Sequence, residues 1–536
     1  MRRNTVIALG VCVTFALVMT GELSAATYYV DPSGSNGNDG SSPATAWKTI
    51  QQAADVLGAG DTVYIGDGTY YESVYFNRDG TAANPIRFVA ESAGNVIVKK
   101  SENRVFYLNS ASYVQFDGLT IRGDLEDYEA VRIRDGVGIV FTNCDISGFG
   151  DELEDDLFDI QDSEITVIGC KVHNAGDQAF EIRSSTTLLV QASEIYGAAE
   201  DGFHTNGSST NATITIERSH IYNNRRRGIR AEGIDLQIRN CLISGNGDGS
   251  SGEGIYVDSN LSCLVEHCTI VNNTRYGVRA NGGGSATLRN SIIAFNGSYG
   301  LKAQNGATFS SSTDYNLLYA NGSANYSGVT PGADDIVADP TFIGGGDYHL
   351  QAGSPAIDTG TGAMPVDLEG KSRPQGAGVD RGCYEVGSSI YYVRTSGDDS
   401  NLGTSPAHAF QSLGKAASAV YAGGIVYVGA GTYAESATLT RSGTALEPIQ
   451  FIADTTGANT GDAGNVILTP TAANGVVCAL SSSNYVTFSG FTLSGGGFSG
   501  ARGMVLSSSL SVTFEDCDFS DLEYGIHGTA SAMFVT

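Results

Sequence analysis

Several features that define other protein classes are scarce in this sequence. The 536 residues contain 30 Lys and Arg against 58 Asp and Glu, a formal charge of −28, so the chain lacks the basic footprint of a general nucleic-acid binder. Nine cysteines are spread too thinly for a dense disulfide scaffold. There is no Walker A, HExxH or zinc-ribbon spacing. Beyond the N-terminus, no apolar run reaches the length of a bilayer span.

Glycine, in contrast, is abundant. The chain has 70 glycines, yet 41% of its residues are hydrophobic, which is enough to bury a core. No Gly-X-Y period is present, which excludes collagen. Because glycine is unfavourable inside helices, its abundance indicates many short strands joined by many turns.

The first 26 residues are predicted to be a signal peptide. Arg2 and Arg3 form a charged start, residues 6–19 are apolar but short for a membrane span, and residues 23–26 offer small side chains for cleavage near Ala26. We therefore expect an exported, soluble monomer, secreted or held at the cell surface, without a membrane span.

A long repeat divides the rest of the chain into two modules. The sequences at residues 28–30, 41–44 and 68–70 recur, nearly unchanged, at residues 391–393, 404–407 and 431–433. The predicted domains are a signal peptide (1–26), a first module with an N-terminal helical cap (27–338), a closing segment and linker (339–389), and a second, truncated module (390–536).

A shorter repeat lies inside the first module. Small residues, often preceded by asparagine, recur every 22 to 27 positions at Cys144, Cys170, Ser193, Ser219, Cys241, Cys268 and Ser291. Short β-rich pieces at this period predict an all-β parallel β-helix, in which each turn packs on its neighbours. Leucine-rich repeats have a similar period, but their leucine pattern is absent.

The repeated cysteines are predicted to be buried free thiols in a ladder, since stacked coils place the same position inside the core at every turn. A disulfide is the alternative, because adjacent rungs lie ~4.8 Å apart. A metal cluster is disfavoured, since neither CxxC nor paired histidine accompanies them.

A five-residue phrase precedes each ladder residue, with apolar second and fourth positions that point inward. Its third positions form an outward column of Arg132, Asp159, Glu181, His204, Arg230, Tyr256, Arg279 and Lys302. Its fifth positions form a neighbouring column of Arg134, Gln161, Arg183, Asn206, Glu232, Asp258, Asn281 and Gln304. The residues before each strand are Glu129, Asp156, Gln178, Asp201, Arg227, Glu253, Tyr276 and Tyr299.

A flat face bearing these side chains is suited to an extended acidic polysaccharide, because arginine pairs with carboxylates and tyrosine stacks on sugar rings. The predicted substrate-binding residues are Arg132, Arg183, Arg227, Arg279 and Lys302. The alternative is that these are solvated side chains that protect an exposed sheet from aggregation.

The middle of the column is the predicted reactive site. Four carboxylates on consecutive rungs can hold a hard cation such as Ca²⁺: Asp156, Asp159, Glu181 and Asp201. β-Elimination of a uronate needs its carboxylate neutralised, a base for the C5 proton and an acid for the leaving oxygen. The cation, His204 or Arg230, and Tyr256 can supply these roles. Two alternatives remain open: a hydrolase that uses two of the carboxylates, and a bystander histidine.

The opening of each module resembles the right-handed parallel β-helix family of secreted carbohydrate-active proteins, which includes pectate lyases and chondroitinase-B-like and alginate lyases. The matching motifs are YYVDPSGS (28–35), WKTIQ (47–51), GDTVY (60–64) and GTY (68–70). The resemblance implies a short amphipathic helix at residues 51–57 that caps the solenoid. Residues 339–342, 353–358 and 373–376 resemble the segment that closes such helices.

Some catalytic motifs of these relatives are incomplete. Asp201 and His204 are distantly similar to the Asp-Pro-His-Asp element of mannuronan C5-epimerases, but the proline and the final aspartate are missing. Calcium-dependent pectate lyases use a lysine or arginine base, a role that Arg230 alone can fill in the middle of this column. The second module has the opening but no closing segment, so we expect a fragment of a longer product or a marginally stable C-terminal module.

The sequence thus predicts an exported protein that binds acidic polysaccharide on a β-helix face and cleaves it as a lyase. A non-catalytic surface or adhesion protein is the competing class, and a glycoside hydrolase or C5-epimerase on the same scaffold is a further alternative.

Overall fold

The computed structural model describes residues 25–99, 104–123, 129–148, 155–205, 211–259, 262–351, 353–362, 364–375, 378–386, 390–401, 403–420, 423–443, 445, 448–529 and 533–535. The predicted signal peptide therefore lies almost wholly outside the described residues. No described helix is both long and apolar enough to cross a membrane.

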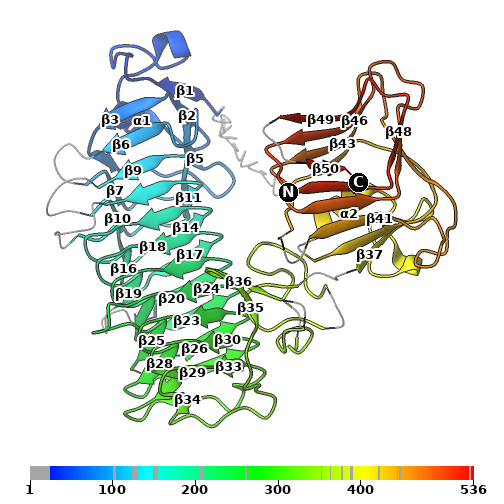
Figure 1. Ribbon diagram of the computed structural model, residues 1–536. Helices are drawn as coiled ribbons and strands as arrows, with labels where there is room; N and C mark the ends of the chain where they lie inside the picture. The colour runs from blue at the N-terminus through cyan, green and yellow to red at the C-terminus, as the bar shows by residue number, and fades with distance from the viewer. Residues whose placement is uncertain are drawn as a thin grey trace, which may run out of the picture.

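The first module is a coil in which each turn contributes one strand to each of three parallel sheets, called A, B and C here (Figure 1). Sheet A contains β1 (Thr27–Val30), β2 (Thr62–Ile65), β5 (Ile86–Ala90), β8 (Val114–Asp117), β11 (Ile139–Thr142), β14 (Glu164–Ile168), β17 (Thr187–Gln191), β20 (Thr213–Glu217), β23 (Asp235–Arg239), β26 (Ser262–Glu266), β29 (Ser285–Arg289) and β32 (Thr308–Phe309). Sheet B contains β3 (Gly68–Tyr71), β6 (Val96–Lys99), β9 (Thr120–Arg122), β12 (Asp145–Ser147), β15 (Lys171–His173), β18 (Glu194–Tyr196), β21 (His220–Tyr222), β24 (Leu242–Ser244), β27 (Thr269–Val271), β30 (Ile292–Ala294) and β33 (Leu317–Tyr319). The prediction of an all-β parallel β-helix is confirmed.

Sheet C carries the predicted site. Its strands are β4 (Val74–Phe76), β7 (Phe106–Asn109), β10 (Val131–Arg134), β13 (Phe158–Gln161), β16 (Phe180–Arg183), β19 (Phe203–Thr205), β22 (Ile229–Glu232), β25 (Ile255–Asp258), β28 (Val278–Asn281), β31 (Tyr299–Ala303) and β34 (Ala324–Ser327). Alternate residues of these strands are buried inside the coil. Phe158, Phe180 and Phe203 stack there with centroid spacings of 4.9 and 4.8 Å, so equivalent residues of successive rungs pack as columns.

The small-residue ladder is buried as predicted, and all eight cysteines of the described chain are free thiols. The ladder side chains also bond the backbone of the preceding rung. The Cys170 amide donates to the Ser193 hydroxyl (3.1 Å), and the Ser193 amide donates to the Ser219 hydroxyl (3.2 Å). A small polar side chain at this corner therefore satisfies a buried N–H that turns away from the sheet ladder.

The asparagines that follow the ladder residues have two separate roles. Asn174, Asn223 and Asn272 adopt positive φ at the turns, a conformation that asparagine tolerates. A second, buried set bonds rung to rung, as where the Asn246 side chain donates to the Asn273 side chain at 2.9 Å. Its members are Asn224, Asn246, Asn273, Asn296 and Asn321.

Glycine has a role here besides the positive-φ turns. A column of glycines precedes the sheet C strands at Gly202, Gly228, Gly254, Gly277 and Gly300, none with positive φ. A Cβ on Gly254 would meet the Gly277 carbonyl oxygen and the Ile270 side chain, both at 2.8 Å. At these five rungs the next rung approaches too closely for a side chain, whereas the same position is Ala130, Leu157 and Ala179 in the preceding rungs.

The cap of the solenoid is α1 (Ile50–Val56), one residue earlier than the predicted 51–57. The Thr49 side chain accepts the Gln52 amide, and the Glu72 carboxylate accepts the amides of Ile50 and Gln51, each at 2.9 Å. The second module repeats this arrangement with Ser412, Glu435 and α2 (Leu413–Ala419). Each module also has a 3-10 turn before its helix, at Pro43–Thr45 and Pro406–His408.

The closing segment folds back over one end of sheet B. It contains the antiparallel pair β35 (Phe342–Gly344) and β36 (Asp347–Leu350). Strands β24, β27 and β30 are buried on both faces, because their outer face packs on Leu350, Ala356 and Cys383 of this segment.

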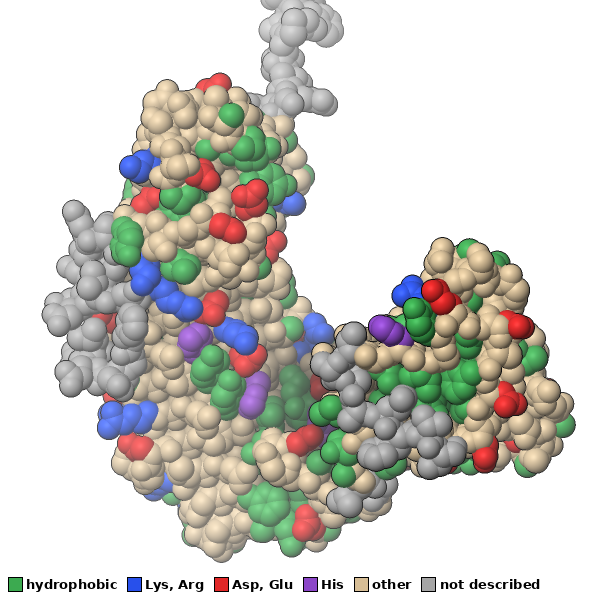
Figure 2. Space-filling model, turned by 45° about the horizontal axis from the view of Figure 1, so that its top comes forward, with side chains coloured by type: hydrophobic (Ala, Val, Ile, Leu, Met, Phe, Trp, Pro, Cys, Tyr) green, Lys and Arg blue, Asp and Glu red, His purple; other side chains and the backbone are tan. Residues whose placement is uncertain are grey.

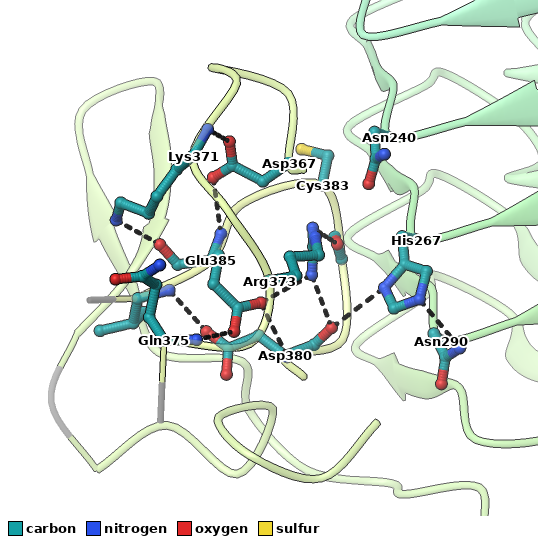
Figure 3. A network of polar contacts seen from close by, with 12 residues as sticks. Asn240, His267, Asn290, Asp367, Lys371, Arg373, Gln375, Asp380, Cys383 and Glu385 are labelled. Carbon is teal, nitrogen blue, oxygen red and sulfur yellow. Dashed lines mark hydrogen bonds and ion pairs between the residues drawn. The ribbon is translucent and has the colours of Figure 1, made fainter. Parts of the chain in front are cut away.

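A buried polar network fastens this segment (Figure 3). The fully buried Arg373 pairs with Glu385 at 2.9 Å and donates to the Asp380 and Gly382 carbonyls. Asn290 and Thr361 exchange two hydrogen bonds of 2.8 Å between the solenoid and the segment.

The second module repeats the three-sheet arrangement over fewer turns. One sheet contains β37 (Ile390–Val393), β38 (Ile425–Val428), β41 (Ile449–Ala453), β44 (Val486–Ser489), β47 (Val512–Glu515) and β50 (Met533–Val535). The second contains β39 (Gly431–Ala434), β42 (Val466–Thr469), β45 (Thr492–Ser494) and β48 (Asp518–Ser520). The third, the counterpart of sheet C, contains β40 (Ala437–Leu439), β43 (Val476–Ser481), β46 (Arg502–Ser507) and β49 (Tyr524–Thr529). The module has its own hydrophobic core, and the predicted domain boundaries remain predictions.

The glycine column predicts that Gly254→Ala destabilises the protein by roughly 1–3 kcal/mol, because the added methyl group overlaps the backbone of the next rung. Denaturant unfolding followed by circular dichroism measures the change. Gly37→Ala is the control, since a Cβ at Gly37 would meet the Ser35 hydroxyl at an ordinary 3.6 Å. Equal stability of the two variants would contradict the close approach.

Candidate functional site

The outer face of sheet C aligns the predicted site residues in register. On neighbouring strands of the sheet, Arg132 is the register partner of Asp159, Asp159 is that of Glu181, and Glu181 is that of His204. His204 then pairs with Arg230, Arg230 with Tyr256, Tyr256 with Arg279, and Arg279 with Lys302. The column is therefore continuous over eight rungs, with ~4.8 Å between neighbours.

Three acidic side chains of this face point out of the coil but are buried. Asp159 and Asp201 are 0% exposed and Glu181 is 5% exposed. Long arginine side chains from neighbouring rungs lie over the short carboxylates and bury them. Figure 2 shows a similar mixing on one face of the molecule, where basic and acidic side chains adjoin instead of forming separate patches.

Asp159 holds three arginines together. Its carboxylate pairs with Arg132 at 2.9 Å, with Arg183 at 3.6 Å, and with Arg134. Burial acts to raise the pKa of Asp159, but the arginines outweigh it and lower that pKa overall. Asp159 therefore stays ionised and fixes the predicted binding residues Arg132 and Arg183.

Glu181 orients His204. The His204 Nδ1 lies 2.5 Å from Glu181 Oε2. An ionised carboxylate can only accept, so Nδ1 carries the proton and Nε2 is the nitrogen able to take one up. The His204 side chain is 16% exposed, which leaves the imidazole within reach of a ligand on this face.

Other carboxyl groups surround this pair. Burial and then Glu200 raise the pKa of Asp177 to about 6, while His204 acts to lower it. Burial and then Glu181 raise the pKa of Asp156 well above its ordinary value. Burial also raises the pKa of Asp201, although Arg227 opposes the shift. Asp177 was not among the predicted residues, because it lies in a turn outside the repeated phrase.

Glu253 organises the next part of the column. It is 0% exposed and accepts from Arg227 Nε at 3.1 Å and from Arg279 Nη1 at 2.9 Å. Both guanidinium groups lie 5.0 Å from the centre of the Tyr256 ring, which is clamped between them. Glu253 was known from the sequence only as a residue before a strand, and its burial makes it the anchor of two predicted binding residues.

The remaining predicted residues have distinct partners. Arg230 donates to Glu232 through Nε (2.9 Å) and Nη2 (2.8 Å). The Tyr256 hydroxyl donates to Asp258 at 2.6 Å, and burial followed by Asp258 raises its pKa to about 12. Lys302 donates to the Ser327 hydroxyl at 2.9 Å and lies 4.7 Å from the Tyr299 ring centre.

The carboxylates do not form a ready-made cation site. Among the residues that the structure describes, no group of three or more His, Cys, Asp or Glu side chains is arranged to hold a metal ion. Asp159 already pairs with three arginines. Asp201 accepts a hydrogen bond from the backbone amide of Arg227 (2.9 Å) and pairs with the guanidinium of the same arginine (3.4 Å). Part of the acidic run, residues 151–154, lies outside the described chain. The calcium site stays a prediction.

Sequence reasoning also missed one end of the column. Tyr75 and Tyr107 continue it beyond Arg132, since Tyr75 pairs with Tyr107 and Tyr107 with Arg132. These two rungs lie before the repeated phrase begins at residue 130, so its spacing gave no signal for them. The alternation of buried and outward residues in β4 and β7 is the signal that would have found them.

Comparison with known proteins agrees with this architecture. The family model described as "Pel9A-like, right handed beta helix region" matches residues 28–327. The chain belongs to the Pel9A-like right-handed β-helix family.

Other similarities are distant or partial. The uncharacterized protein YwoF of Bacillus subtilis (strain 168) is 30% identical over 101 residues, 18% of this chain and 21% of that protein. The chain thus spans about a fifth of the length of that relative.

Among solved structures, pectate lyase Pel9A is 16% identical, with 67% of this chain and 96% of that chain covered and a TM-score of 0.46. An alginate lyase from Paenibacillus sp. str. FPU-7 is 14% identical, with coverage of 54% and 96% and a TM-score of 0.32. The mannuronan C-5 epimerase AlgE4 A-module of Azotobacter vinelandii is 13% identical, with coverage of 90% and 94% and a TM-score of 0.30. At these sequence identities and TM-scores, the similarity gives no information about activity.

The two modules of this Pel9A-like protein differ on the face in question. In the second module, the column equivalent to the site contains Thr438, Ala479, Val505 and His527. No described residue of that column is an arginine or a carboxylate. These four rungs correspond to Tyr75, Tyr107, Arg132 and Asp159, so the arginine and carboxylate that begin the charged row in the first module are replaced here.

The buried pairing predicts that Glu253→Ala lowers the free energy of unfolding by about 3–5 kcal/mol at neutral pH, because two arginines lose their shared partner. Burial acts to raise the pKa of Glu253, but Arg227, the Gly252 amide and Arg279 lower it below its ordinary 4.5.

A carboxyl group whose pKa is lowered by folding stabilises the protein fully above pH 4.5. This stabilisation is lost as the pH falls through the pKa of the group in the folded protein. The difference between wild type and Glu253→Gln, measured by denaturant unfolding, should therefore shrink below pH 4.5. A difference that does not depend on pH would contradict the ionised pair.

Proposed function

We propose that the first module binds an extended acidic polysaccharide along sheet C and cleaves it by β-elimination at a uronate next to His204. The single observation that carries the proposal is an imidazole oriented by a buried carboxylate within a row of arginines. The predicted signal sequence supports an exported protein, which would meet such polymers outside the cell.

The arginine row supplies the binding surface. Asp159 and Glu253 hold five guanidinium groups in place, so their side chains are ordered before the ligand arrives. Preorganised arginines lose less conformational entropy on pairing with a carboxylate. Arg183 is 41% exposed and Arg230 is 31% exposed, so these two flank His204 with accessible positive charge.

His204 is better suited than Arg230 to act as the base. Although burial acts to lower it, the pKa of Arg230 is raised above its ordinary value because Glu232 stabilises the cation. Such a guanidinium does not give up its proton near neutral pH. In His204 the Nδ1 atom is bonded to Glu181, so Nε2 is the ring nitrogen placed to take the proton.

The reaction follows from these roles. Arg230 and Arg183 pair with the uronate carboxylate, which makes the C5 proton more acidic and stabilises the carbanion character that develops. His204 Nε2 takes the C5 proton, the electron pair forms the C4–C5 double bond, and the C4–O bond breaks. Tyr256 keeps its proton because its pKa is about 12, and it is the proposed acid for the leaving oxygen, after its hydroxyl releases Asp258. No step is assigned to a metal ion.

The proposal predicts that the protein releases products with the absorbance of an unsaturated uronate from alginate, pectate or chondroitin. His204→Ala should reduce the rate by roughly 10²- to 10⁴-fold, the usual contribution of a general base. His527→Ala is the matched control, because His527 occupies the equivalent column of the second module.

Unchanged activity in His204→Ala would remove this residue from the mechanism. New reducing ends without the absorbance would indicate a hydrolase. Binding without any cleavage would favour the non-catalytic alternative.

A further inference from the structure

The sheet C column changes character at its N-terminal end, where tyrosines replace charged residues. Tyr75 is 42% exposed, and its ring lies 5.5 Å from that of Tyr107 at an angle of 67°. Together with Ser73, Val74 and Arg104, these rings line a groove with a volume of about 190 Å³.

The two rings are held by polar contacts. Asn109 Nδ2 donates to the Tyr75 hydroxyl at 3.2 Å, and the Tyr107 hydroxyl donates to Asn109 Oδ1 at 3.4 Å. Both aromatic walls therefore have fixed orientations, and ring faces are presented at low entropic cost, as in carbohydrate recognition by tyrosine.

Arg104 connects this groove to the charged row. Its guanidinium carbon lies 5.7 Å from the Tyr107 ring centre, and its Nε donates to Glu129 at 2.7 Å. Glu129 also pairs with Arg132, the first arginine of the column. The aromatic groove and the arginine row are thus one continuous surface.

We propose that Tyr75, Tyr107 and Arg104 form a distal subsite, which stacks on one pyranose ring of the polysaccharide whose uronates occupy the arginine row. Register partners lead from Tyr107 through Arg132, Asp159 and Glu181 to His204, four rungs or ~19 Å away. The subsite rests on the proposed function. The subsite distinguishes long from short oligosaccharides, because a trisaccharide bound at His204 is too short to reach Tyr107.

The test measures binding by calorimetry with the full chain carrying His204→Ala, so that no substrate is turned over. The probes are a trisaccharide and a decasaccharide of each of alginate, pectate and chondroitin. In the added Tyr107→Ala and Tyr75→Ala variants, decasaccharide affinity should fall roughly threefold to tenfold, and the gain from trisaccharide to decasaccharide should shrink.

Two controls separate stacking from damage. Tyr107→Phe keeps the ring and should retain decasaccharide affinity. Tyr64→Ala removes a tyrosine of equal exposure (41%) from sheet A and should have no effect.

Unchanged decasaccharide affinity in Tyr75→Ala and Tyr107→Ala overturns the subsite, as does an equal loss in Tyr64→Ala. If the protein that carries His204→Ala alone binds none of the three polymers, both the proposed function and the proposed subsite are wrong. That outcome is distinct from binding that ignores the tyrosines.

Discussion

The pairing of parallel strands between successive rungs is the constraint on which this structure depends. Backbone hydrogen bonds hold equivalent residues ~4.8 Å apart, so any residue type that recurs in register becomes a column. Inside the coil this produces stacked phenylalanines and the ladders of cysteine, serine and asparagine. At the corner before sheet C, the neighbouring rung leaves no space for a Cβ at the five rungs from Gly202 to Gly300. On the outer face of sheet C, the same spacing places charged side chains close enough to bind one another.

Electrostatics on that face follow from this spacing. Columns of like charge at ~4.8 Å would repel, and here the buried carboxylates of Asp159, Glu181 and Glu253 each pair with at least one arginine. The carboxylates of Asp159 and Glu253 position arginines, and that of Glu181 positions a histidine. The formal charge of −28 describes the whole surface, whereas the surface proposed for polysaccharide binding is a fixed row of guanidinium groups within it.

The sequence predicts most of the fold, because period and alternation are local signals. The 22–27-residue spacing from Cys144 to Ser291 predicts the rungs, and alternation predicts which side chains leave the core. The burial of Asp159 could not be predicted in this way, since it depends on how long arginine side chains from two other rungs fold over it. Tyr107 and Asp177 were missed because one precedes the repeated phrase and the other lies in a turn, where register gives no guidance.

The central claim is that sheet C of the first module is a site for uronate polymers centred on His204. A crystal structure of the full chain carrying His204→Ala, soaked with a uronate oligosaccharide, tests it most directly. The account predicts a sugar chain along sheet C, with one carboxylate on Arg230 or Arg183 and its C5 facing the position of the His204 imidazole. Sugar bound on sheet A, on sheet B or on the second module, with sheet C empty, would contradict the account.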